Sequence, residues 1–137
     1  MADTFLLEIV TPYKKCLSTE VNEATAPAFK GEIGVLPGHT QFITILKPGP
    51  ISYKKGTETG LIAIGKGYAE VGPDKTIIIV DVAEEASAIN LQAANASLAK
   101  CEEAMKTLST EDPTYQSTID EYELAQARIT VGEKFKG

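Results

Sequence analysis

The stretch TIIIVDVAEEASAINLQAANASL, residues 76–98, changes in composition part-way along its length. Its first part is rich in β-branched residues, which favour strands. From Ala83 onward the chain is instead rich in Glu, Ala, Gln, Lys and Leu, which are strong helix formers. The sequence therefore predicts a β-domain over residues 1–84 and a helical segment over residues 88–137.

Before this switch, the chain is divided into short apolar runs by glycine and proline, a pattern typical of strands joined by turns. Phe5, Leu7 and Ile9 share one face of the first run. Residues 77–80 are apolar on both faces, as expected of a central strand in a two-layer stack. We therefore expect a β-sandwich or flattened barrel. The expected strands are 5–10, 16–26, 41–46, 51–54, 61–64, 68–71 and 76–82.

After the switch, the sequence predicts two helices. Small or apolar residues recur at steps of three and four and place one stripe on the first helix. A second helix is expected from Pro113 toward Phe135, with Asp112 as its cap and Gly132 weakening its last turns. The two stripes could meet in an antiparallel hairpin. The residues are Leu91, Ala94, Leu98, Cys101, Met105 and Leu108 in the first helix, and Tyr115, Ile119, Tyr122 and Ile129 in the second.

A hairpin of this size cannot bury much apolar surface by itself, so we expect it to lean on the β-domain or on another protein. Its charge differs from that of the β-domain. Residues 1–83 carry 9 acidic and 8 basic side chains, whereas residues 84–137 carry 10 and 5. The chain thus has two parts, and their marginal contact is where a conformational switch could lie.

Composition excludes several classes of function. The formal charge is −6, which argues against nucleic acid as a partner. No run approaches the roughly 18 apolar residues of a membrane helix, and the start lacks the pattern of a signal peptide. Cys16 and Cys101 are isolated, as in proteins of a reducing compartment, and have no metal-ligand spacing, so no metal is expected.

The densest cluster of special residues runs from Gly31 to His39 and reads GEIGVLPGH. Its glycines and proline demand turns. Glu32 and His39 could form a base and its orienter in a small hydrolase, but no serine or cysteine nucleophile with a matching turn accompanies them, and one histidine makes a poor transition-metal site. We therefore expect no catalytic residues here, and a structural or contact role for the cluster.

This cluster, followed by Lys47-Pro48-Gly49, resembles the signature of the epsilon subunits of bacterial F-type ATP synthases. The opening FLLEIVTP at residues 5–12 and GKGYAEV at residues 65–71 are similar to that family as well. The resemblance covers essentially the whole chain. It implies an N-terminal β-sandwich, a C-terminal helical hairpin and a non-catalytic subunit of an enzyme complex.

The resemblance also implies a role in the proton-translocating synthase. The sandwich is expected to grip the gamma subunit and to sit on the ring of membrane subunits, coupling rotation to ATP synthesis at the cytoplasmic face of the bacterial plasma membrane. The residues expected to face the ring are Glu32, Gly38, His39 and Thr40. A carboxylate on a rigid loop can fix register against basic partners there.

In this family the hairpin can fold against the sandwich or extend to the catalytic alpha and beta subunits and inhibit ATP hydrolysis. Inhibition in relatives relies partly on basic residues of the hairpin meeting an acidic segment. This hairpin offers few such residues against its ten acidic ones. The candidates for the inhibitory contact are Lys100, Lys106, Arg128, Lys134 and Lys136.

Some relatives bind ATP on the folded hairpin through a motif with an acid and an arginine. The matching segment here is Ile89-Asn90-Leu91-Gln92-Ala93-Ala94, in which Asn90 replaces the acid and Ala93 replaces the arginine. Only Arg128 on the second helix is left to meet phosphate. The resemblance therefore implies that ATP binding through Ile89, Asn90, Ala93, Ala94 and Arg128 is weak or absent, that no cofactor is held, and that Asn90 caps the helix.

One alternative comes from another class of protein. An unrelated cytosolic β-sandwich binding module could dimerise through the stripe from Leu91 to Leu108. It would be a stable symmetric dimer, whereas a rotor subunit need not be.

Overall fold

The computed structural model describes residues 3–38 and 40–136. Over this part of the chain, a β-sandwich is followed by two α-helices, which confirms the predicted fold class. The elements are β1 (Phe5–Val10), β2 (Lys15–Val21), β3 (Glu23–Ala28), β4 (Gly31–Val35), β5 (Phe42–Leu46), β6 (Gly49–Lys55), β7 (Glu58–Ile64), β8 (Gly67–Val71), β9 (Lys75–Val80), β10 (Ala83–Glu85), the 3-10 helix η1 (Ala86–Ala88), α1 (Leu91–Met105) and α2 (Tyr115–Lys136).

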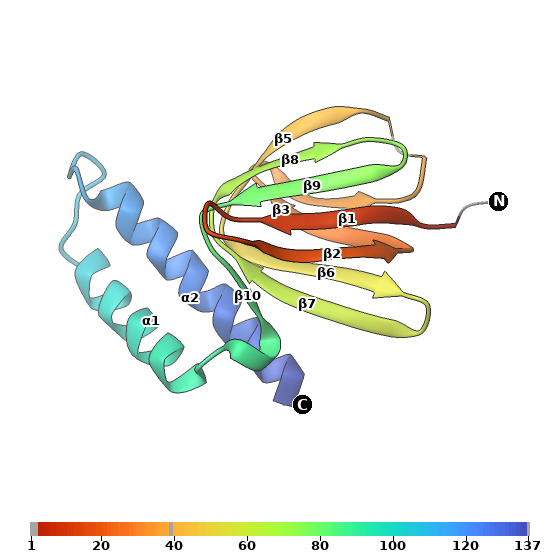
Figure 1. The fold of residues 1–137 in the computed structure, drawn as a ribbon. Helices are drawn as coiled ribbons and strands as arrows, with labels where there is room; N and C mark the ends of the chain where they lie inside the picture. The colour runs from red at the N-terminus through yellow and green to blue at the C-terminus, as the bar shows by residue number, and fades with distance from the viewer. Residues whose placement is uncertain (1–2, 39, 137) are drawn as a thin grey trace.

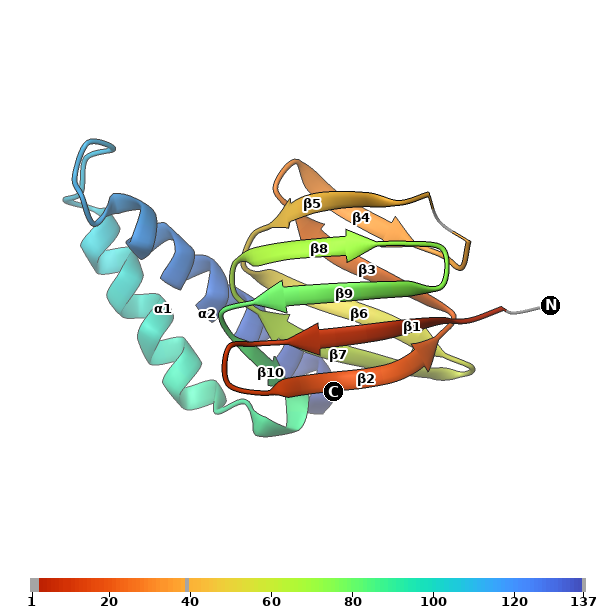
Figure 2. The same cartoon turned by 45° about the horizontal axis from the view of Figure 1, so that its top comes forward.

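The strands form one sheet that folds over on itself (Figure 1, Figure 2). One layer has the order β5-β8-β9-β1-β2, and the other has β4-β3-β6-β7-β10. The pair β1–β9 is parallel, and the other described pairs are antiparallel. The layers join where Ala28 of β3 pairs with Leu46 of β5.

The core lies between the two layers. Phe5, Leu7 and Ile9 of β1 are at most 1% exposed, so the inward face predicted for the first strand is confirmed. Ile78 and Val80 of β9 point inward beside them. The other buried members of this core are Val21, Ala24, Ala26, Ala28, Val35, Leu46, Ile51, Ile62, Ile64, Ala69 and Val71.

Residues 16–26 are not one strand, as the sequence analysis expected, but parts of two, β2 and β3, with Asn22 between them. The side chain of Asn22 donates to the Asp3 carbonyl at 3.0 Å and accepts from the Gly56 N–H at 2.6 Å. Such bonds to backbone groups stabilise a bend. The chain changes layer there.

The cluster from Gly31 onward was expected to consist of turns, but most of it forms β4. This strand pairs with β3, with Glu32 opposite Pro27. Gly31, at φ 132°, closes the tight turn that leads into it. Glycine content was therefore misleading here, because the hairpin needs glycine at the turn and tolerates Gly34 in the strand.

The segment 76–82, expected as one central strand, is divided between β9 and the residues before β10. Ile78 is 2% exposed, but Ile77 and Ile79 on the opposite face are only partly buried. β9 nevertheless lies between β8 and β1 in its layer, so the prediction of a central strand in a two-layer stack is confirmed. No described segment covers the outer face of β9 completely.

The two helices form the predicted hairpin, with α2 nearer to the sandwich than α1 (Figure 1). Asn90 caps α1, as expected, by accepting the Ala93 N–H at 3.0 Å. Asp112 accepts the Thr114 N–H at 2.9 Å, and α2 begins at Tyr115 rather than at Pro113. The hairpin thus has polar caps at the start of both helices.

The predicted stripe of α2 is only half-buried, and its fully buried positions carry small residues instead. These are Ala125, Ala127, Val131 and Gly132. A Cβ added at Gly132 would lie 2.7 Å from Cδ2 of Leu91. Gly132 therefore lets the two helices approach closely, and α2 continues to Lys136 rather than weakening there.

Glu8 is a nearly buried carboxylate on the outer face of β1, 8% exposed. It accepts hydrogen bonds from Lys15 and Lys75, both at 2.9 Å, and from Ser18 at 3.1 Å. The bonds from Lys15 and then Lys75 lower the pKa of Glu8 from 4.5 to about 2, against the opposing effect of burial. Glu8 thus stays ionised and joins β1, β2 and β9.

We expect Glu8→Gln to lower the free energy of unfolding at pH 7. The folded-state pKa is below the unfolded one, so the carboxylate stabilises the fold fully above pH 4.5 and loses this effect as the pH falls toward 2. Urea unfolding of both proteins should show a difference that shrinks over that window. The control Glu58→Gln, at an exposed position of β7, should show a smaller difference at pH 7. A difference for Glu8→Gln that is constant with pH would contradict this role.

Candidate functional site

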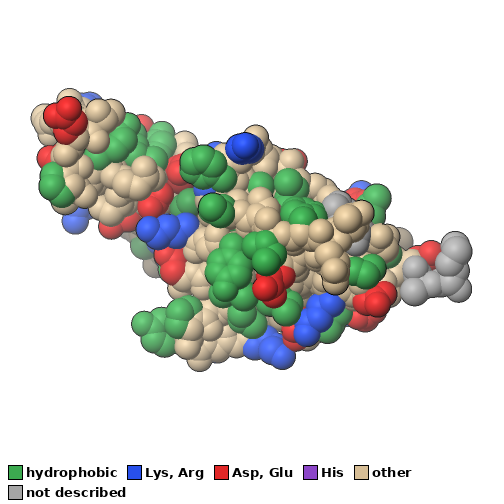
Figure 3. Space-filling model, turned by 90° about the horizontal axis from the view of Figure 1, so that it is seen from above, with side chains coloured by type: hydrophobic (Ala, Val, Ile, Leu, Met, Phe, Trp, Pro, Cys, Tyr) green, Lys and Arg blue, Asp and Glu red, His purple; other side chains and the backbone are tan. Residues whose placement is uncertain are grey.

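The outer face of the layer β5-β8-β9-β1 carries apolar side chains where a solvated antiparallel sheet would carry polar ones. Alternation along the strands places these residues there: Leu6, Val10, Ile43, Ile45, Tyr68, Ile77 and Ile79. Figure 3 shows hydrophobic side chains exposed on the side of the molecule where β5 and β8 lie in Figure 1. This face is suited to contact with another protein.

The most exposed part of this face is formed by Phe29, Ile43, Ile45 and Tyr68, which we call the β5–β8 patch. Their exposed fractions are 71%, 68%, 65% and 42%. Phe29 lies in the β3–β4 turn and is held next to β5 because its N–H donates to the Ile45 carbonyl at 2.9 Å. A contiguous group of large apolar side chains, unlike scattered single ones, indicates an interaction site.

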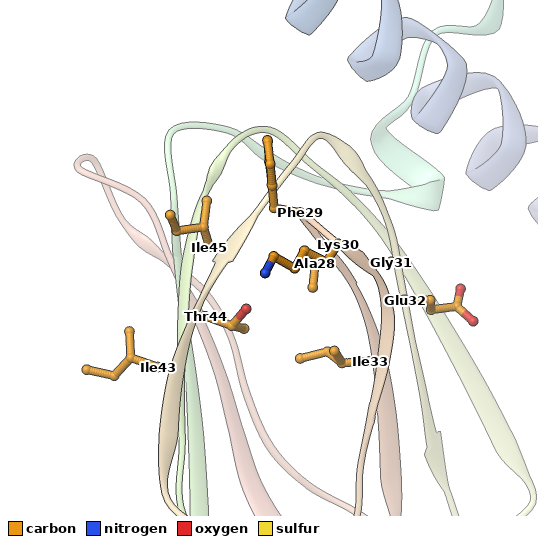
Figure 4. Close-up of a pocket in the computed structure, with 9 residues that line it drawn as sticks. All are labelled: Ala28, Phe29, Lys30, Gly31, Glu32, Ile33, Ile43, Thr44 and Ile45. Atoms are coloured by element: carbon orange, nitrogen blue, oxygen red, sulfur yellow. The ribbon is translucent and has the colours of Figure 1, made fainter.

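A cavity of about 420 Å³ opens beside the patch, between the β3–β4 turn and β5 (Figure 4). Ile33 and Thr44 point toward one another across it, whereas Glu32 points away. Phe29 and Ile45 lie at one end. The cavity is thus largely apolar, with the Thr44 hydroxyl and the ammonium group of Lys30 as polar groups beside one another in it (Figure 4).

The residues predicted to face the membrane ring do not lie together. Glu32 is exposed near the start of β4, whereas Gly38 lies in the turn that follows the other end of that strand. Gly38 has φ 80°, and its N–H donates to the Pro73 carbonyl at 2.8 Å. Thr40 is exposed next to it, and His39 lies outside the described residues.

The residues predicted for ATP binding gather where α1 begins, but their side chains have structural partners. Asn90 caps α1, Ala94 is 1% exposed, and Ile89 packs against the cluster of Ala63, Ala127 and Val131. Ala93 is exposed, and its N–H is used by the cap. Arg128 forms an ion pair with Glu84. Phosphate would have to compete with Glu84 for the guanidinium group.

The basic residues predicted for the inhibitory contact lie on both helices. Lys100 and Lys134 are exposed, and Lys106 pairs with Glu103 at 3.1 Å. Arg128 faces Glu84, and of Lys136 only the helical backbone is described. These residues therefore do not form one basic surface in the docked hairpin.

Docking of the hairpin rests on the C-terminal half of α2. Ala127 and Val131, 2% and 0% exposed, contact Ala63 of β7, and Leu61, Ala86 and Ile89 surround them. Two further ion pairs link α2 to the sandwich, Lys66 with Asp120 at 3.3 Å and Lys47 with Glu123 at 3.5 Å. The contact combines a small apolar centre with charged pairs around it.

No group of His, Cys, Asp or Glu side chains suited to a metal ion occurs within residues 3–38 and 40–136. In the same part of the chain, none of the helices combines the length and apolarity needed to cross a bilayer.

Comparison with known proteins decides the family. Residues 4–86 match the family described as ATP synthase, Delta/Epsilon chain, beta-sandwich domain. The ATP synthase epsilon chain of Geobacter metallireducens is 45% identical over 98% of this chain and 97% of its own length, and that of Geotalea daltonii is 44% identical over the same shares. This chain belongs to the ATP synthase epsilon chains. Epsilon chains are non-catalytic subunits of that enzyme complex, so the hydrolase hypothesis built on Glu32 and His39 is wrong.

Solved structures share the fold of this epsilon chain. A chain of the Euglena gracilis mitochondrial ATP synthase superposes with a TM-score of 0.78 at 20% identity, covering 93% of this chain and 80% of that one. A chain of the Tetrahymena thermophila mitochondrial ATP synthase gives 0.56 at 12%, covering 97% and 96%. The alternative of a module that dimerises through the stripe from Leu91 to Leu108 is not supported by the burial of this stripe, because Ala94 and Cys101 are already buried within the monomer.

Sequence reasoning missed the β5–β8 patch of this epsilon chain. The signal was present, because Ile43 and Ile45 alternate with Phe42 and Thr44 in a run that is apolar on both faces. It could have been interpreted as one face for the core and one for a partner. The cavity beside Phe29 could not be predicted, because it depends on the relative position of β5 and the β3–β4 hairpin in space.

We expect Ala127→Glu to release α2 of this epsilon chain from the sandwich. Ala127 is 2% exposed, and an unpaired carboxylate there would have to be buried or move out. Trypsin cleavage after Arg128 and amide exchange in α2 should accelerate, while the sandwich stays folded because its core contains no helical residue. The control Ala99→Glu, at an exposed position of α1, should behave like the wild type. Unchanged protection of α2 in Ala127→Glu would contradict docking through this contact.

Proposed function

We propose that this epsilon chain is a central-stalk rotor subunit of a proton-translocating ATP synthase, coupling rotation of the membrane ring to ATP synthesis. Family membership supports the role, and the Tetrahymena relative of similar fold comes from a structure of the central stalk and c-ring. The observation that carries the proposal is the exposed β5–β8 patch, which needs a partner. The complex holds the chain peripherally at the cytoplasmic face of the membrane.

The gamma subunit is the partner we assign to the β5–β8 patch. Ile43, Ile45 and Tyr68 offer a flat apolar surface on two paired strands, with Tyr68 opposite Ile45. Burial of such side chains supplies most of the affinity of a stable contact, and aromatic residues are over-represented among its strongest positions. A rotor subunit must transmit torque to its partner, and a rigid sheet face is suited to this role.

The membrane ring is the partner we assign to Glu32 and to the segment Gly38-His39-Thr40. Glu32 is exposed on a short hairpin, so its carboxylate can meet a polar loop without loss of internal contacts. Gly38 and Thr40 lie beyond the far end of β4. The two contacts therefore engage the ring as separate points rather than as one loop.

The hairpin is proposed to inhibit ATP hydrolysis when it leaves the sandwich for the alpha and beta subunits. Because its docking contact with the sandwich is small, the docked and extended positions of the hairpin can have similar free energies. Extension would break the Arg128–Glu84 pair and free Arg128 to join Lys100, Lys106, Lys134 and Lys136. ATP is not expected to hold the docked form, because Asn90 and Arg128 have structural partners.

Tyr68→Asp should weaken binding to the gamma subunit by about 30-fold, the effect of losing one strong interface position of about 2 kcal/mol. The dissociation constant can be measured with the purified catalytic head that contains gamma. Thr59→Asp places the same charge on an exposed strand position of the other layer and should bind normally. Equal affinity of both variants would assign gamma to another face.

The hairpin proposal is tested by ATP hydrolysis in the same catalytic head, with the full chain or with a version ending at Ala88. Both forms should bind, because the core of the sandwich lies before that residue. Only the full chain should lower the rate. If both bind and neither changes hydrolysis, the hairpin is not inhibitory and the chain is a coupling element alone.

A further inference from the structure

The edge of β5 that faces the β3–β4 hairpin is only partly paired. On its other edge, β5 pairs with β8 over its whole length, from Phe42 with Val71 to Leu46 with Gly67. On the edge toward β3 it pairs only through Leu46 with Ala28. Among the described residues, no strand therefore lies against residues 43–45 on that side.

The direction of the backbone groups follows from one hydrogen bond. The Ile45 carbonyl accepts from the Phe29 N–H, so the backbone groups of Ile45 point toward this edge. Along a strand they point to opposite edges at successive residues, so those of Ile43 point to the same edge as those of Ile45. Ile43 thus presents one donor and one acceptor, with the spacing that an extended chain can pair.

Space for side chains lies next to this edge. The 420 Å³ cavity is bounded by residues of the β3–β4 hairpin, among them Phe29 and Ile33, and by residues 43–45. Thr44 and Ile33 point into it (Figure 4). On the other face of the edge lie the exposed side chains of Ile43 and Ile45. A strand added here would therefore find apolar side chains on both of its faces, with the Lys30 ammonium group beside it on the cavity side.

We infer that this epsilon chain binds its rotor partner by strand addition: an extended segment of the partner pairs with β5 at Ile43. The inference rests on the proposed function and specifies how the contact is made. Backbone hydrogen bonds hold the segment, and its alternate side chains enter the cavity beside Ile33 and cover Ile43 and Ile45 outside. The occupant is an extended segment because an open edge offers backbone groups that a helix cannot pair.

The apolar face described above begins at this edge and continues onto β8 at Tyr68, whereas Glu70 of β8 lies opposite Ile43. The continuity through Tyr68 favours the rotor partner over an unrelated peptide. Tyr68 lies opposite Ile45 on the next strand. A subunit seated on the β5–β8 patch therefore reaches the edge with no intervening polar strip on β5. The segment should carry apolar residues at alternate positions and no proline opposite Ile43.

Ile43→Pro tests the pairing in the full chain, because proline has no N–H to donate to an added strand. The hydrogen bonds from β5 to β8 are kept, because they are made by Phe42, Thr44 and Leu46. The control Ile43→Thr keeps the N–H and a β-branched side chain. Binding to the catalytic head that contains gamma should be at least tenfold weaker for Ile43→Pro than for Ile43→Thr, the loss expected for one hydrogen bond with its partner left unpaired. Thermal unfolding of each variant shows whether it is folded.

Amide exchange in the wild-type chain gives a second measurement that needs no variant. The Ile43 amide should exchange quickly in the free chain and slowly in the complex, whereas the Thr44 amide should be protected in both, since it faces β8. If the wild type binds but the Ile43 amide stays fast and the two variants bind equally, strand addition is wrong and the rotor proposal stands. If the wild type does not bind the head, the proposed function itself fails.

Discussion

The pairing of Ala28 with Leu46 is the point on which both the fold and its surface depend. It joins the two layers, with hydrogen bonds from Phe29 to Ile45 and from Lys47 to Pro27 on either side. Because Pro27 has no N–H, the pairing is limited there, and β6 takes over as the neighbour of β3. β5 then continues with β8 in the other layer. On the other side of the Ala28–Leu46 pair, residues 43–45 run past the β3–β4 turn, and the cavity lies between them and that hairpin, with Phe29 at its end.

The hairpin is attached to this framework by a contact of a different character. Its apolar centre is mostly small, since Ala63, Ala127 and Val131 bury few carbon atoms. Ion pairs such as Lys66–Asp120, with side chains 63% and 19% exposed, add about 0–1 kcal/mol each at a surface. The sandwich, by contrast, has a core of large side chains that contains no helical residue. We therefore expect the two parts to differ in stability, so that the helices can separate from a sandwich that stays folded.

The sequence could predict those features that depend on local chemistry. Asn90 as a cap involves few neighbouring residues, and this prediction is confirmed. The change to helix formers at Ala83 precedes the first α-helix by several residues, because Ala83–Glu85 still form β10, which pairs with β7. Features that depend on distant partners failed. β4 has the glycines of a turn and becomes a strand because β3 lies beside it. Gly132 has the propensity of a helix end and instead lies within α2, where it makes room for Leu91. For the candidate site, Glu32, Gly38 and Thr40 could be singled out from the family signature, but their separation by β4 could not be foreseen.

The outer face of β5 shows that a strand with apolar residues on both faces can be covered on its second face either by its own chain or by a partner. Covered by a second layer of the same chain, Ile43 and Ile45 would belong to a core, but here they are 68% and 65% exposed. Soluble proteins usually protect an open strand edge with charge, proline or a covering segment, because it would otherwise pair with other chains. Residues 42–46, FITIL, carry no charge and no proline. An edge without such protection is tolerable where a permanent partner covers it, so this feature of β5 is better explained by a chain that functions within an assembly than by one that functions alone.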